Sequence, residues 1–175
     1  MPARPVIGPT LYRWERMGLD ASVYCDCFER GRLRTPPRPE WGVHVDEEGG
    51  RSPTTKDLDE QIAFDAWNYR DACEHENGVL LHQRLGNISL IGLFRQLLNA
   101  HVDRLPVIVK KIIYSGSHAG DSLSLEIVEQ LGAEIEALGQ IHERDRKNEQ
   151  FLRDFEQQLR ELVECSRKVG KPIVF

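Results

Sequence analysis

Three cysteines and one histidine are the residues in this sequence with the clearest chemical capacity. Cys25 and Cys27 are one residue apart, and Cys73 and His75 repeat that spacing further along the chain. Three thiolates and an imidazole form a ligand set of structural zinc sites. Zinc-binding turns, however, space their cysteines by two to four residues, whereas alternate residues of a strand lie about 6.5–7 Å apart. Because free cysteine is often buried, the pattern favours core residues with no metal and no other cofactor, and zinc remains the alternative.

Two histidines near this segment form the second group. His75 and His82 are seven residues apart, and Gly78 lies between them. The helical His-Glu-x-x-His pattern of metalloproteases is therefore absent. The segment Asn77-Gly78 is instead typical of a helix end, where a residue with positive φ is needed.

The third group is the small-residue loop at 115–121, which holds His118 and Asp121. Small residues let a ligand approach the backbone, and a histidine–aspartate pair is suited to general acid–base catalysis. No serine on a strand-to-helix elbow and no phosphate-binding lysine accompanies the pair. A turn before a helix requires the same residue types for local reasons, so the pattern favours a structural loop.

Two functional interpretations follow from these groups. A non-catalytic binding domain is favoured, with six polar residues expected near a functional groove: Asp20, Tyr24, His75, His82, His118 and Asp121. The alternative is a small hydrolase-like enzyme, whose site would bring together His118, Asp121, His75 and Asp20. An enzyme of that kind requires these side chains to converge in one concave pocket.

Alternating apolar residues predict the strands. They indicate a strand over residues 19–27 and a second over 79–85, with a short edge strand at 172–175, where Pro172 cannot donate to a central ladder. Between the first two strands, residues 30–56 contain several prolines and a Gly-Gly pair, and predict an irregular insertion with a short strand at 41–45.

Apolar residues at helical spacing predict helices over most of the remainder. Residues 106–113 are ambiguous, because Pro106 favours the start of a helix and the run Val107-Ile108-Val109 favours a strand, and a short helix is preferred. The other expected helices start near Thr55 and run to Asn77-Gly78, start at Asn87 or Ser89 and run to 98, start at Ser122 or Ser124 and run to 138, and cover 145–169. In the first, the inward stripe is expected to be Leu58, Ile62, Ala66, Tyr69 and Cys73. In the last, Gly170 is expected to end the helix in the left-handed conformation.

These elements predict an α+β fold. We expect one domain at residues 17–175, with three or four mostly antiparallel strands packed by about five helices and a long amphipathic C-terminal helix across the sheet. Residues 1–16, which have no such pattern, are expected to be a poorly ordered N-terminal extension.

Composition and charge limit the partners. The formal net charge is −5, which disfavours binding to a nucleic-acid backbone. Residues 122–164 contain eleven acidic and five basic side chains, so the acidity is concentrated there and suits a basic protein partner. No apolar run is long enough for a membrane span and no signal-peptide pattern occurs at the N-terminus, so the expected location is the cytoplasm.

Several motifs together resemble one family of bacterial proteins. They are the Met-Gly-Leu-Asp start at residues 17–20, the Gly-x₇-Phe-Arg helix at 86–95, the apolar segment and loop at 112–121, and the closing Gly-x-Pro-Ile-x-Phe at 170–175. This arrangement is similar to a family of immunity proteins from polymorphic-toxin systems. The loop sequence Ser-Gly-Ser-His-Ala-Gly-Asp and the long insertion at 30–56 differ from that family's pattern.

The resemblance implies a function without catalysis. Immunity proteins of this kind bind a cognate toxin domain in the cytoplasm and block it. For this chain the expected partner is a basic toxin domain, which would meet the acidic helix at 145–164.

Overall fold

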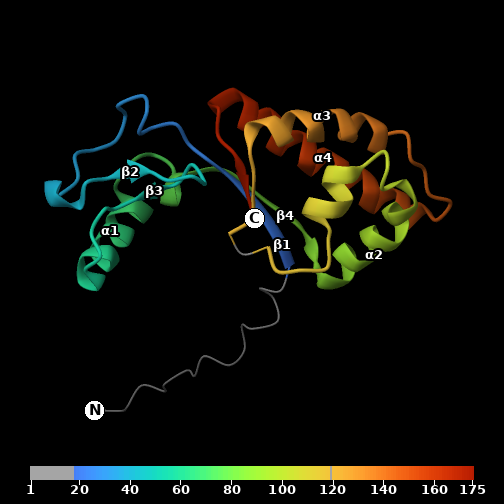
Figure 1. Cartoon of the computed structure of the whole chain (residues 1–175), viewed down its shortest axis with the longest axis horizontal. Helices are drawn as coiled ribbons and strands as arrows, with labels where there is room; N and C mark the ends of the chain where they lie inside the picture. The colour runs from blue at the N-terminus through green and yellow to red at the C-terminus, as the bar shows by residue number, and fades with distance from the viewer. Residues whose placement is uncertain (1–17, 119) are drawn as a thin grey trace, which may run out of the picture.

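The computed structural model describes residues 18–118 and 120–175 (Figure 1). The extension expected at residues 1–16 lies outside this range. The described residues form an α+β fold with a four-stranded antiparallel sheet, a separate two-stranded hairpin, four α-helices and a π-helical turn. The predicted fold class is therefore confirmed.

The sheet has the strand order β4-β1-β6-β5. The long strands β1 (Gly18–Tyr24) and β4 (Val79–Asn87) pair antiparallel along the full length of β1. The short strands β5 (Ser122–Leu123) and β6 (Ile173–Val174) extend the sheet on the other side of β1. Both long strands occur where alternating apolar residues predicted them.

The C-terminal strand corrects one expectation. Residues 172–175 were predicted to form an edge strand, but β6 lies between β1 and β5. Pro172 precedes Ile173, the first residue of the strand, so its missing N–H interrupts no ladder bond. The chain end is held further by the Phe175 N–H, which donates to the Asp121 carbonyl at 2.9 Å.

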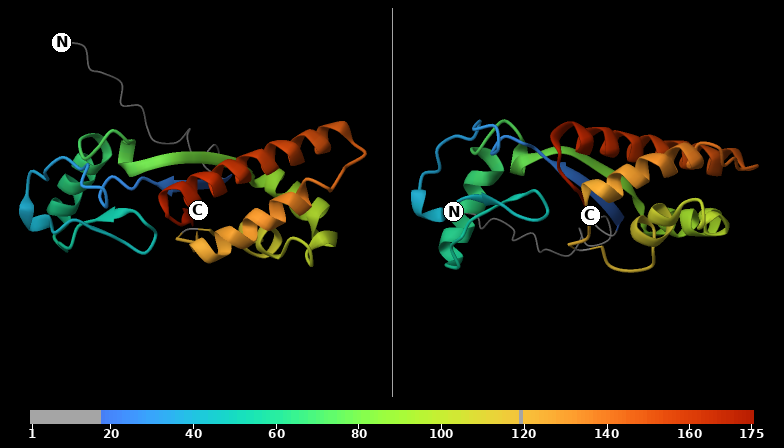
Figure 2. Two further views of the ribbon diagram at one scale, coloured as in Figure 1. Left: turned by 90° about the horizontal axis from the view of Figure 1, so that it is seen from above. Right: turned by 45° about the horizontal axis from the view of Figure 1, so that its top comes forward.

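Three helices cover one face of the sheet. The side chains of Leu19, Ala21 and Val23 point to this face and are buried against α2 (Ile88–Leu98) and α4 (Arg146–Val169). The helix α3 (Leu125–Leu138) packs against α4 in the same layer (Figures 1 and 2). This layer holds the main hydrophobic core, and the long terminal helix crosses the sheet as predicted.

Local signals set the ends of these helices. The Asp145 carboxylate accepts the N–H groups of Lys147 and Asn148 and so caps α4, while Gly170 ends it at φ +67°. Asn87 caps α2 through the Leu90 N–H. Of the two expected starts of α3, Ser124 is the residue that precedes the helix, whereas Ser122 pairs in β5. None of the helices in the described ranges is long and apolar enough to cross a membrane.

The helix expected at 106–113 is present as a π-helical turn at Ile108–Ile112. A buried side chain from α3 supports its start. The Glu134 carboxylate accepts the N–H groups of Val107 at 2.8 Å and Ile108 at 2.9 Å. Two donors that the turn leaves without intrahelical partners are satisfied in this way. Short 3-10 turns occur at Pro39–Trp41, Glu76–Gly78 and Asn99–His101.

Residues 28–72 form a small lobe at the far end of the β1–β4 pair from α2 and α3 (Figures 1 and 2). It contains the hairpin β2 (His44–Val45) and β3 (Arg51–Ser52) and the helix α1 (Leu58–Arg70). Its buried cluster consists of four residues, Trp41, Phe64, Trp67 and Ala72. The predicted insertion is therefore part of a packed unit, and the strand expected at 41–45 is present at its last two residues.

The helix α1 differs from the prediction in its cap and in its buried face. Asp57, not Thr55, caps it by accepting the Glu60 N–H, and it ends at Arg70 rather than at Asn77-Gly78. The predicted inward stripe is wrong, since Leu58 is 68% exposed and Ile62 is 57% exposed. The aromatic side chains that surround Trp41 occupy the opposite side of the helix, and they decide which face is buried.

The first strand is shorter than predicted. β1 ends at Tyr24, so Cys25 and Cys27 lie in the turn that follows. The Cys25 N–H donates to the Gly78 carbonyl at 2.8 Å, and the Arg32 N–H donates to the Cys27 carbonyl at 2.8 Å. The expectation that both thiols lie on one face of a strand is therefore wrong.

Candidate functional site

The sheet face opposite the helices gathers three of the six predicted site residues. Asp20 and Tyr24 extend from β1 on this face, and His82 extends from β4 opposite Ser22. The Ser22 hydroxyl lies 3.0 Å from His82 Nδ1, and Asp20 Oδ1 lies 4.0 Å from His82 Nε2. Ser22 is not among the predicted residues, because the alternating pattern shows which face a serine occupies but not which residue lies opposite it on the next strand.

The contacts from Asp20 to His82 and from His82 to Ser22 follow the order of a hydrolytic triad, but these side chains are more exposed than those of an active site. The His82 side chain is 59% exposed and that of Asp20 is 39% exposed. Active sites strengthen such contacts by excluding water, and an exposed sheet face does not provide this. The three residues are consistent with surface hydrogen bonding across the β1–β4 ladder.

The loop at 115–121 holds His118 and Asp121 against the chain end. The Tyr114 hydroxyl lies 2.5 Å from Asp121 Oδ2, and this hydrogen bond raises the pKa of Tyr114. The Tyr114 ring also lies against the His118 ring, with centroids 4.3 Å apart. These contacts, with the Asp121–Phe175 backbone bond, hold the loop in place and account for its residue types.

The remaining predicted residue, His75, lies with Cys25, Cys27 and Cys73 at the base of the small lobe. It lines a hollow of about 230 Å³ together with Asp26 and two arginines. His118 lines a different hollow, of about 80 Å³, next to Gly18 and Ile88. The residues named for an enzyme site are thus distributed over separate places in the fold.

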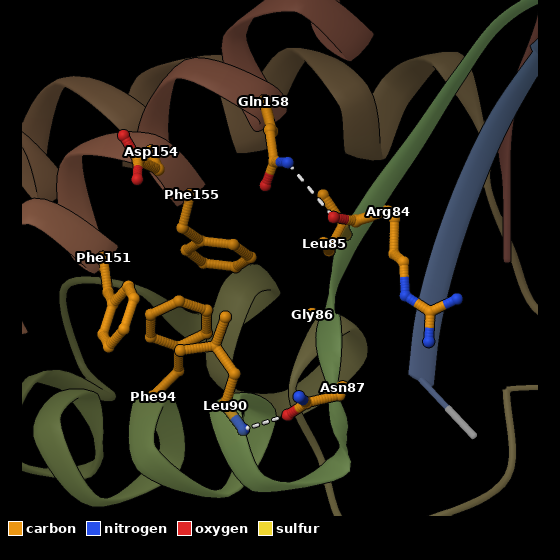
Figure 3. Close-up of a pocket in the computed structure, with 10 residues that line it drawn as sticks. All are labelled: Arg84, Leu85, Gly86, Asn87, Leu90, Phe94, Phe151, Asp154, Phe155 and Gln158. Atoms are coloured by element: carbon orange, nitrogen blue, oxygen red, sulfur yellow. Dashed lines mark hydrogen bonds between the residues drawn. The ribbon is translucent and has the colours of Figure 1, made fainter. Parts of the chain in front are cut away.

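A hollow of about 770 Å³ lies between β4, α2 and α4 (Figure 3). We call it the aromatic groove. Ten residues from these three elements line it: Arg84, Leu85, Gly86, Asn87, Leu90, Phe94, Phe151, Asp154, Phe155 and Gln158. A second hollow of about 340 Å³, which includes Ser89 and Leu93, shares Asn87, Leu90 and Phe151 with it. The two form a continuous and largely apolar depression.

Stacked aromatic rings form the floor of the aromatic groove. The rings of Phe94 and Phe155 have centroids 4.5 Å apart and an interplanar angle of 26°, and each residue is 1% exposed. Phe151 is only partly buried and lies beside this pair (Figure 3). Lys147 Nζ lies 5.6 Å from the centroid of the Phe151 ring. Phe151 therefore offers an accessible aromatic surface next to a rigid floor.

Polar groups surround this floor. The Gln158 side-chain amide donates to the Arg84 carbonyl at 3.1 Å, and Asn87 accepts the Leu90 N–H at 2.9 Å (Figure 3). The Arg84 side chain points away from the groove, toward β1, and Asp154 lies on the α4 side (Figure 3). This arrangement suits a partner that inserts an apolar side chain into the groove and places polar groups at its edge.

Only part of this site is predictable from the sequence. Phe94, Phe151 and Phe155 lie on helices that the spacing of apolar residues predicts. A helical period cannot show that α2, α4 and β4 leave a hollow above these rings, because the hollow depends on how the three elements pack. Exposure of Phe151 was therefore not foreseeable from its spacing.

No protein-family model matches the chain, and no curated protein and no solved structure is significantly similar to it. The class that the chain itself defines is an α+β domain with an aromatic groove beside its sheet.

Proposed function

We propose that this chain is a non-catalytic protein-binding domain that acts as a cytoplasmic immunity protein, with the aromatic groove receiving an apolar side chain of a basic toxin domain. The observation on which this rests is the accessible Phe151 ring beside the buried Phe94–Phe155 stack. Partly exposed aromatic residues in a preformed groove are typical energetic centres of protein interfaces.

The composition of the groove favours a protein partner over a small polar substrate. Its floor is aromatic, and Leu90 and Leu93 extend the apolar surface beyond it. Asp154, Gln158 and Asn87 supply a polar rim. A buried apolar centre inside a polar rim is the usual anatomy of a protein–protein interface.

Charge favours a basic partner. The segment 122–164, which includes α3 and most of α4, has eleven acidic and five basic side chains. The arginines of these helices are largely engaged within them, as in the pairs Arg160–Glu156 at 3.1 Å and Arg167–Glu129 at 2.6 Å. The excess acidity next to the groove would speed encounter with a cationic domain and make binding weaken with salt.

The enzyme alternative has less support. It requires His118, Asp121, His75 and Asp20 in one pocket, yet His75 and His118 line separate hollows and Asp20 lies on the open sheet face. The binding proposal needs no convergence of these side chains.

The experiment is capture of the partner from the source cytoplasm with tagged wild-type chain at low and moderate salt. We expect one stoichiometric protein of basic composition that is retained less well at the higher salt. Expressed alone, this protein should be toxic, and co-expression of the chain should abolish the toxicity. Wild-type capture without any such toxicity would contradict the immunity function.

Two variants locate the binding surface. Phe151→Asp places a charge in the groove and should abolish both capture and protection. Gln157→Asp adds the same charge at an exposed position of α4 outside the groove lining and should leave both unchanged. Circular dichroism is used to check that both variants are folded. If folded Phe151→Asp protects as well as wild type, the groove is not the binding site.

A further inference from the structure

Four side chains that could ligate a metal meet at the base of the small lobe. The ligand atoms of Cys25, Cys27, Cys73 and His75 all lie within 4.8 Å of one another. Cys25 Sγ lies 3.9 Å from Cys73 Sγ, and His75 Nδ1 lies 3.4 Å from Cys27 Sγ and 3.8 Å from Cys73 Sγ. We call these four side chains the thiol cluster.

Three of the six distances within the cluster match the edges of a zinc tetrahedron, and the other three are no longer than 4.8 Å. With Zn–S bonds of about 2.3 Å and a Zn–N bond of about 2.0–2.1 Å, the S···S edges are about 3.8 Å and the S···N edges about 3.6 Å. The Cys25–Cys73 edge and the edges from His75 Nδ1 to Cys27 and Cys73 agree with these values to within a few tenths of an ångström.

We propose that Cys25, Cys27, Cys73 and His75 bind a zinc ion in a closed structural site. Three thiolates and a neutral imidazole use all four tetrahedral positions, which is typical of structural rather than catalytic zinc. The three cysteines are buried, so their environment excludes water from the ligand sphere. Soft thiolates in tetrahedral geometry select zinc over magnesium or calcium, which take oxygen ligands.

The groups around the cluster suit a charged metal–thiolate centre. Zn²⁺ with three thiolates has a net charge of −1, and the Arg51 guanidinium lies against it, with Nη1 donating to Cys73 Sγ at 3.2 Å. The His75 backbone N–H also donates to Cys73 Sγ, at 3.4 Å. On the other side of the imidazole, Glu74 Oε1 lies 4.0 Å from His75 Nε2. A carboxylate near the free imidazole N–H is a common outer neighbour of a zinc-bound histidine.

The position of the cluster explains what the ion does. Cys25 and Cys27 come directly before the small lobe in the chain, and Cys73 and His75 come directly after it. The buried hydrophobic cluster of the lobe consists of only four residues, Trp41, Phe64, Trp67 and Ala72. Small units with so little core usually need a metal or a disulfide to stay folded. A zinc ion would join both ends of the lobe to the end of the β1–β4 ladder.

The spacing of Cys25 and Cys27 disfavours zinc only if both residues lie on a strand. Because β1 ends at Tyr24, the chain turns between the two thiols and brings both toward one centre. Cys73 and His75 are brought to the same centre because α1 ends at Arg70, before them, rather than including Cys73.

The test is the zinc content of the full chain, purified without a metal-binding tag under reducing conditions. We expect about one zinc ion per chain in wild type and in Cys165→Ser, whose thiol lies on α4 outside the cluster. Cys27→Ser and Cys73→Ser should lose most of the zinc. Wild type loaded with Co²⁺ should show the visible bands of tetrahedral thiolate coordination.

A histidine variant distinguishes ligation from a loss of folding. His75→Cys converts the site to four thiolates and should retain zinc with an altered Co²⁺ spectrum, whereas His75→Ala should bind zinc more weakly. The proposal is overturned if reduced wild type takes up neither Zn²⁺ nor Co²⁺, or if the cysteine substitutions leave its zinc content unchanged. A Cys25–Cys73 disulfide in freshly isolated protein that contains no zinc would also overturn it.

Discussion

The Sγ atoms of Cys25 and Cys73 lie 3.9 Å apart although 48 residues separate them in the chain. This contact closes the small lobe at its base. It forms where β1 gives way to a turn and where the connection from α1 enters β4. The packing of the lobe and the geometry of the thiol cluster are therefore linked.

Removal of zinc should loosen the small lobe while the main core stays folded. Trp41 and Trp67 form the lobe core, with ring centroids 5.8 Å apart, so their fluorescence reports on it. In a Trp14→Phe background, we expect a chelator to shift their emission to longer wavelength and to expose residues 28–72 to protease. Helical circular dichroism should largely persist, because α2, α3 and α4 belong to the main core.

Zinc added back should restore the original emission, which controls for damage by the chelator. Cys165→Ser should respond as wild type does. Unchanged emission and unchanged proteolysis after complete removal of the ion would contradict a structural role for it.

Gly78→Ala should destabilise both the lobe and the metal site. Gly78 has φ +70°, and a Cβ there would lie 2.5 Å from Arg51 Nη2. The strained backbone alone costs about 1 kcal/mol or more, and displacement of Arg51 removes a donor to Cys73 Sγ. Urea denaturation should show the loss, and a chelator competition assay should show weaker zinc binding.

Gly92→Ala is the matched control for this substitution. Gly92 lies within α2, and a Cβ there meets no atom within 4 Å. Since alanine is a better helix former than glycine, this variant should gain up to about 1 kcal/mol. Equal effects of the two substitutions would contradict the role given to the backbone at Gly78.

How far the sequence determines the fold differs from element to element. The β1 and β4 strands and the helix α4 were predicted well, because each has a long apolar pattern with one dominant period and, in α4, a clear cap at each end. Short elements such as β6 have no such pattern. Only its partners β1 and β5 place it inside the sheet.

The sites were harder to predict because they depend on contacts between distant segments. The sequence showed that Cys25, Cys27, Cys73 and His75 are potential metal ligands, but the expectation that Cys25 and Cys27 lie on a strand was wrong, because β1 ends at Tyr24. In α1, two candidate apolar faces were available, and the choice depended on where Trp41 lies. The end of β1 and the buried face of α1 are both set by tertiary contacts, which the local sequence pattern does not show.

The two phenylalanines of α4 in the aromatic groove should separate stability from binding. Phe155 is buried and stacked on Phe94, so Phe155→Ala should cost about 3–5 kcal/mol in the free energy of unfolding. Phe151 is only partly buried, so Phe151→Ala should cost much less, while it should weaken partner binding. Urea denaturation and the toxin-protection assay measure the two effects. A stable Phe155→Ala would mean that the stack adds little to the core.

The buried carboxyl of Glu134 should make stability depend on pH. Burial raises its pKa above the ordinary value of 4.5, and the N–H groups of Ile108 and Val107 only partly offset this. The folded state therefore favours the protonated form more than the unfolded state does. The stabilising effect of protonation is complete below the unfolded pKa and is lost as the pH rises through the folded pKa.

Glu134→Gln has no ionisable group at this position and supplies the comparison. We expect the stability of wild type relative to this variant to fall as the pH is raised from about 4 to about 7, in urea denaturation at constant ionic strength. Glu126→Gln, at an exposed position in the first turn of α3, controls for the general loss of one negative charge. If the relative stability of wild type instead rises with pH, the two backbone donors outweigh burial, and the π-helical turn at Ile108–Ile112 is held by the ionised carboxylate.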